Sequence, residues 1–74
     1  MKGINEKYIG EYECKYGEEV LFTIVKRDNK LIASTFCNVG MIEDYEWNLD
    51  KSFSIDENLN DFIDYINERE ERRI

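Results

Sequence analysis

Apolar and polar residues alternate with a period of two over most of the first fifty positions. This pattern is typical of β-strands with one buried face. It predicts four strands, at about residues 8–16, 20–27, 30–38 and 41–49. The short connections between them contain Gly17, Asp28-Asn29 and Asn38-Val39-Gly40. Because short connections join antiparallel neighbours, we expect a meander of consecutive hairpins.

The segment from Val20 to Cys37 is the most apolar and β-branched part of the chain, so we expect the sheet to nucleate there. A two-residue turn at Asp28-Asn29, where both residues tolerate positive φ, places Val25 opposite Ile32. Both faces of this hairpin are apolar. A single helix can cover only one of them. The other face needs sheet curvature, aromatic side chains or another molecule.

The first and fourth strands also alternate, and Glu43 interrupts the apolar side of the fourth. In the first, the alternation puts Tyr8 and Tyr12 on the same side, and Gly10 indicates a bulge or a close approach. The length of the first turn stays open, and with it the face on which Tyr12 lies.

In the fourth strand, a three-residue turn with Gly40 in the left-handed region is expected. That turn stacks Trp47 beside Leu31, and the alternation puts Met41 on the same side as Tyr45.

A helical period follows residue 50. Ser54 and Glu57 have the spacing of a capping box. One apolar helical face then follows at i, i+3, i+4 and i+7, formed by Leu59, Phe62, Ile63 and Ile66. The helix is predicted at about residues 55–71. The fold class is therefore α+β, a four-stranded antiparallel β-meander followed by one C-terminal α-helix packed on one face of the sheet. The 74 residues form a single domain, 1–74.

The residue types argue against catalysis. The chain has no histidine, so nucleophilic hydrolysis with a histidine base and histidine-ligated metal sites are excluded. No glycine-rich phosphate loop occurs. A four-stranded sheet with one helix offers little cleft for a carboxylate pair to work across. We therefore expect no enzyme activity, no cofactor and no metal site.

Localisation is predicted to be cytoplasmic. No segment resembles a signal peptide, and none approaches the roughly 18 apolar residues of a membrane span. Cys14 and Cys37 are the only cysteines, and we expect two reduced thiols that behave as small buried hydrophobic residues.

The chain is acidic, with a net charge of −7. This charge would repel phosphates, so neither nucleic acid nor an anionic membrane is expected as a direct partner. Residues 41–67 contain eight acids and one base, whereas the segments before and after them are each neutral. The excess charge thus belongs to the fourth strand, the connector and the first turns of the helix.

The helix acids follow one another on a single face, opposite the apolar one. Together with three strand acids they form the candidate surface for a basic protein partner: Glu43, Asp44, Glu46, Glu57, Asp61, Asp64 and Glu68. Glu71 continues the helix row. Like-charge pairs such as Glu57–Asp61 cost a helix about 0.2–0.5 kcal/mol each. A solvated face would usually contain interspersed lysines, although simple solvation of an acidic protein remains the main alternative.

Aromatic residues are the second candidate. Tyrosine and tryptophan are favoured as anchors of protein interfaces. Tyr45, Trp47 and Tyr65 are assigned to the weaker, aromatic part of the partner-binding surface, with core packing as the alternative.

Three functions are compatible with these features. The most concrete is a small acidic, non-enzymatic inhibitor, of the kind that phages and mobile elements encode, which blocks a basic nucleic-acid-binding site on a host defence or regulatory protein. The second is an antitoxin or immunity-type partner of a basic toxin. The third is a homodimeric structural domain that pairs its second apolar face with itself.

Overall fold

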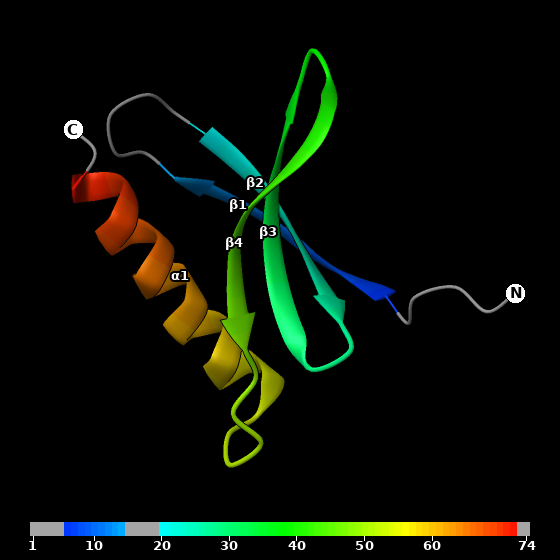
Figure 1. Ribbon diagram of the computed structural model, residues 1–74. Helices are drawn as coiled ribbons and strands as arrows, with labels where there is room; N and C mark the ends of the chain where they lie inside the picture. Colours follow the sequence, from blue (N-terminus) through cyan, green and yellow to red (C-terminus); the bar gives the residue numbers. More distant parts are fainter. Residues whose placement is uncertain (1–5, 15–19, 73–74) are drawn as a thin grey trace, which may run out of the picture.

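The computed structural model describes residues 6–14 and 20–72 and has the predicted α+β fold (Figure 1). The sheet has the order β1-β2-β3-β4, with every neighbouring pair antiparallel, and one helix, α1, follows it. The bounds are β1 (Glu6–Cys14), β2 (Val20–Arg27), β3 (Lys30–Cys37), β4 (Gly40–Asn48) and α1 (Ile55–Arg72). Strand β1 begins two residues before the predicted start. Its predicted continuation to residue 16 and the turn at Gly17 lie outside the described residues.

The hairpin of β2 and β3 has the predicted register. Arg27 pairs with Lys30 around a two-residue turn, and Val25 lies opposite Ile32. Asp28 has a positive φ of 55°, and it is the only non-glycine residue among those described that does. The turn therefore uses the left-handed tolerance of one residue of the pair, not both.

The turn between β3 and β4 is shorter than predicted. Cys37 pairs with Gly40, so the loop has two residues. Gly40 does have a positive φ, of 113°. This region of φ favours glycine because it lacks a Cβ.

The extra residue that was predicted in this turn lies in β4 instead, as a bulge at Asp44, where the register shifts. Trp47 still pairs with Leu31, because a bulge and a longer turn add the same single residue. The bulge does change the faces, however. Met41 lies opposite Phe36 on the face away from Tyr45, so the predicted grouping of Met41 with Tyr45 is wrong.

A second bulge lies in β1. The register shifts between Tyr8 and Gly10, which leaves Ile9 as the additional residue. No heavy atom lies within 4 Å of a Cβ built on Gly10, so this glycine marks the bulge and not a close approach. The bulge places Tyr8 on the outer face, where it is 60% exposed, while Tyr12 packs against the core. The prediction that they share a side is wrong for this reason.

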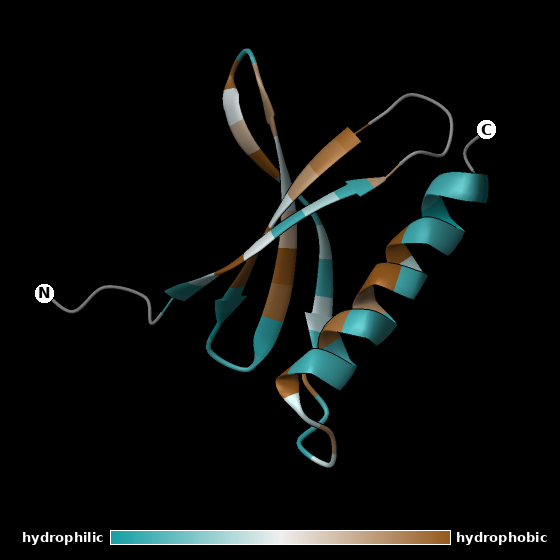
Figure 2. Cartoon of the chain, turned by 180° about the vertical axis from the view of Figure 1, so that it is seen from behind, coloured by the Kyte–Doolittle hydropathy of each residue, from teal (hydrophilic) through white to brown (hydrophobic). Residues whose placement is uncertain are grey.

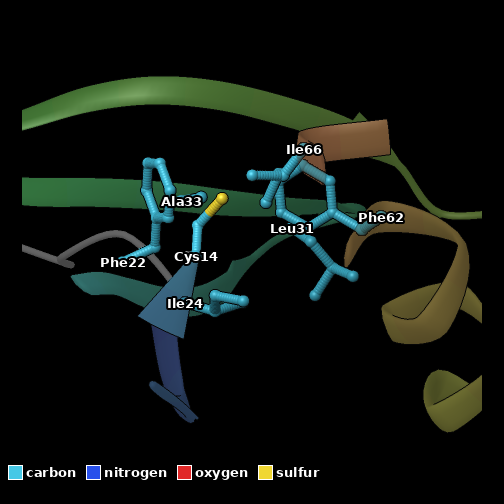
Figure 3. Packing of buried hydrophobic residues seen from close by; sticks show 7 residues of the cluster. All are labelled: Cys14, Phe22, Ile24, Leu31, Ala33, Phe62 and Ile66. Carbon is cyan, nitrogen blue, oxygen red and sulfur yellow. The ribbon is translucent and has the colours of Figure 1, made fainter. Parts of the chain in front are cut away.

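Helix α1 covers one face of the sheet, and Figure 2 shows its apolar side turned toward the strands. The core between the two layers is a single cluster of buried side chains (Figure 3), formed by Cys14, Phe22, Ile24, Leu31, Ala33, Phe62 and Ile66. Burial of this apolar area is the main driving force of the fold.

The start of α1 is held by a capping box and by a clamp that the sequence did not reveal. Ser54 and Glu57 exchange the two predicted hydrogen bonds, of 2.9 and 3.1 Å. Asn58 is almost completely buried. Its Oδ1 accepts a hydrogen bond from the Asp50 backbone N–H, and its Nδ2 donates to the backbone oxygens of Asp50 and Ser54. This side chain ties the connector after β4 to the first turn of the helix.

Candidate partner-binding surface

The helix acids are exposed on α1, outside the apolar side that Figure 2 shows turned toward the strands. The buried stripe of the helix repeats every four residues and includes Phe62 and Ile66, so residues on the opposite side of the helix face solvent. Among the described residues, neither Asp61 nor Asp64 forms an ion pair. Glu68 is 3.6 Å from the Arg72 guanidinium, one turn further along.

The strand acids have different surroundings. Glu43 accepts a hydrogen bond of 2.7 Å from Arg27, which also binds Glu6, and Glu46 is 3.1 Å from Lys30. The hydrogen bonds that Arg27 donates, first the one to Glu43 and then the one to Glu6, raise the pKa of Arg27 above its ordinary value.

The Arg27 ion pairs also cover part of the outer face of the sheet. Arg27 belongs to β2 and reaches Glu43 on β4, so its side chain crosses β3. Ile32 of β3 lines the same hollow as Arg27 and is only 1% exposed. The aliphatic part of a long charged side chain is suited to such covering.

The two groups of acids do not form one continuous surface. Glu46 pairs with Ile32, whereas Trp47 pairs with the core residue Leu31. Side chains alternate across a strand, so Glu46 points to the face opposite the helix. Asp44, at the bulge, accepts a hydrogen bond of 2.8 Å from the Thr35 hydroxyl. The structure thus separates Glu43 and Glu46 from the row on α1, whereas Asp44 lies on the helix side of the sheet, in a hollow that Glu70 also lines.

The three aromatic candidates take two different roles. Tyr45 packs against the core, and its hydroxyl donates a hydrogen bond to the buried carboxylate of Glu70. Trp47 and Tyr65 are partly exposed, with ring centroids 5.5 Å apart. Phe62 supports both rings from the core, at 6.0 Å from Trp47 and 6.5 Å from Tyr65.

Trp47 and Tyr65 meet three of the helix acids in a shallow groove between β4 and α1. The groove has a volume of about 380 Å³ and is lined by Trp47, Asp61, Asp64, Tyr65 and Glu68. We call it the aromatic–acidic groove. Five of the ten candidate residues therefore lie together, on elements that are separated by the connector after β4.

Arg69 contributes to this region and was not among the candidates. Its guanidinium carbon lies 5.9 Å from the centroid of the Tyr65 ring, which is a cation–π arrangement. The i,i+4 spacing of the two residues on one helix is the signal that could have revealed the contact.

The two thiols differ in burial. Cys14 is completely buried in the core, as expected, and its thiol donates to Asn67 Oδ1 at 3.6 Å. Cys37 is only partly buried, and its thiol lies 3.4 Å from the Gly40 carbonyl oxygen. Within residues 6–14 and 20–72, no three cysteine or carboxylate side chains are placed to hold a metal ion together.

Comparison with protein-family models, with curated protein sequences and with solved structures gives no match. In the described part of the chain, no helix combines the length and the apolar character required to cross a bilayer. The geometry of the acids and aromatic residues is therefore the basis for a functional proposal.

Proposed function

We propose that this protein is a cytoplasmic, non-enzymatic binding protein whose acidic helix face binds a basic protein. The observation that supports this is the row of exposed carboxylates on α1, in which Asp61 and Asp64 have no ion-pair partner among the described residues. Adjacent carboxylates of like charge cost helix stability. An arrangement that is unfavourable for the isolated fold is typical of a functional surface.

The row also suits a partner that normally binds nucleic acid. Helix geometry puts successive acids roughly 5 Å apart along the axis, which is comparable to the phosphate spacing of a nucleic acid strand. The most concrete role is that of a phage- or mobile-element-type inhibitor, which occupies the basic nucleic-acid-binding site of a host defence or regulatory protein. An antitoxin or immunity-type protein for a basic toxin would use the same surface. Such binding is fast and salt-sensitive.

A pull-down from cells of the native host, washed at increasing salt concentration, tests the proposal. The double variant Asp61→Lys/Asp64→Lys should lose the partner while keeping the fold. The matched control is Glu11→Lys/Glu13→Lys, which makes the same change in net charge at exposed positions of β1. We expect the control to retain most of the binding. If both variants retain the partner with unchanged salt dependence, the acidic row is only a solvated face.

A homodimer is a second candidate, and the exposed apolar side chains near the β3–β4 turn favour it. Phe36 is 79% exposed and Val39 is 86% exposed. Leu21 and Met41, which share the outer face with Phe36, are each 52% exposed. Figure 1 shows this end of the hairpin projecting beyond the part of the sheet that α1 covers. Light scattering at micromolar concentration decides: a mass near twice 8.9 kDa supports the dimer, and a monomer rejects it.

A further inference from the structure

We propose that the aromatic–acidic groove is a binding site for a single arginine side chain of the basic partner. This inference rests on the proposed function and adds to it the chemical class of the group that is recognised. The groove combines two requirements of guanidinium recognition, a partly exposed aromatic surface and nearby carboxylates, which come from different secondary-structure elements.

The aromatic part comes from Trp47 on β4 and Tyr65 on α1. Their rings are inclined by 50° to each other, and Phe62 packs beneath both at the edge of the core. Rings fixed in this way need little ordering when a ligand binds. Partly exposed indole and phenol faces attract cations through their quadrupoles.

The intramolecular contact of Arg69 is an independent observation that points to the same ligand. Its guanidinium already lies over the Tyr65 ring, at 5.9 Å from the centroid. Arg69 does not line the groove. The Tyr65 ring is thus already beside one guanidinium, which comes from a residue outside the lining of the groove.

The carboxylates determine the charge and favour arginine over lysine. Asp61 and Asp64 form no ion pair among the described residues, so their negative charge is not compensated locally. A guanidinium is planar, so it can stack on a ring while its N–H groups donate to carboxylate oxygens at its edge. An ammonium group is a compact, strongly hydrated charge and cannot do both.

Trp47 is the only tryptophan in the chain, so its fluorescence reports directly on the groove. The probes are three short lysine-containing peptides that differ only at the central residue, which is arginine, lysine or citrulline. We expect the arginine peptide to bind about five- to tenfold more tightly than the lysine peptide, which has the same charge. Citrulline keeps the shape but removes the charge, and its peptide should bind most weakly.

Variants of the groove residues test which side chains cause the preference for arginine over lysine. Tyr65→Leu should reduce the ratio of arginine to lysine affinity to about one, and Tyr65→Phe, which keeps the ring, should preserve most of it. Asp64→Asn should lower the arginine affinity more than Glu71→Gln, which removes one charge from the same helix outside the groove. Asp64 is exposed, so this arm does not depend on how well the Tyr65 variants fold.

The outcomes separate the groove from the wider acidic surface. Equal affinity of the wild-type protein for the arginine and lysine peptides overturns the arginine site. So does an unchanged ratio in Tyr65→Leu, or the absence of any Trp47 response. The pull-down with Asp61→Lys/Asp64→Lys still decides the proposed function in each case, because general attraction to a basic partner needs no preference for arginine.

Discussion

The acids of β4 and the acids of α1 come from one acidic stretch of the chain, yet the fold gives them different surroundings. Glu43 and Glu46 lie on the outer face of the sheet, where Arg27 and Lys30 neutralise them. Asp61 lies on the exposed side of the helix and has no cationic partner among the described residues. Equal formal charges therefore contribute to the structure in one region and remain available in the other.

The difference shows that acids and bases must be counted on each surface of the folded protein and not along each segment of the sequence. Counted along the chain, residues 41–67 hold the whole excess, and the cations Arg27 and Lys30 belong to a segment that is neutral by itself. In three dimensions these cations reach the acids of β4. The negative potential of the outer sheet face is thereby reduced, whereas Asp61 and Asp64 on α1 have no ion-pair partner among the described residues.

The variant with the largest expected effect removes the packing that holds α1, the helix with the exposed acids, against the sheet. Phe62 is completely buried between α1 and the sheet, so Phe62→Ala should lower the free energy of unfolding by about 3–5 kcal/mol. Denaturant unfolding followed by circular dichroism measures the loss. The matched control is Phe53→Ala, at a position that is 50% exposed, which should stay within about 1 kcal/mol of wild type. Similar losses for the two variants would contradict the packing described for α1.

A smaller effect is expected from the clamp that joins the two acidic regions. Asn58 makes its hydrogen bonds to the backbone between the end of β4 and the start of α1. Asn58→Ala removes the side-chain hydrogen bonds of a buried residue and leaves the Asp50 N–H without this acceptor, so we expect a loss of about 1–3 kcal/mol. Asn60→Ala, an exposed position of the same helix, is the control for helix propensity. Thermal unfolding of the two variants should differ, and equal melting temperatures would reject the clamp.

Much of the fold was predictable because local rules and burial agree. The alternation of β2 and β3, the turn at Asp28-Asn29 and the capping box at Ser54 each depend on residues close in sequence. The two bulges were harder. A bulge of one residue, at Asp44 or Ile9, gives the rest of the strand the same register as a turn that is one residue longer. The local sequence pattern therefore cannot decide whether the added residue lies in the strand or in the turn.

The candidate site was predictable in its residue types but not in its grouping. Helical periodicity puts Asp61, Asp64 and Glu68 on one face, because that spacing is a property of the helix alone. The meeting of Trp47 with Tyr65 depends on which face of the sheet α1 covers. Since both faces of the central hairpin are apolar, the sequence left that choice open, and the helix covers the face that carries Phe22 and Leu31.

The two groups of acids can be compared most directly with two variants that change the net charge equally. We expect these variants to change the free energy of unfolding in opposite directions. Asp61→Lys removes the repulsion from Glu57 and creates a favourable i,i+4 pair, so it should raise the free energy of unfolding by about 0.4–1 kcal/mol. Glu46→Lys removes the ion pair with Lys30 and places two cations together on neighbouring strands, so it should lower stability by roughly a few tenths of a kcal/mol. Denaturant midpoints at low salt measure both effects, and added salt should shrink them.

If Asp61→Lys is the more stable protein and also the one that loses the partner, the helix acids are maintained for binding at the expense of the fold. If both variants are destabilised to the same extent, the two groups of acids are equivalent and the distinction between them is wrong.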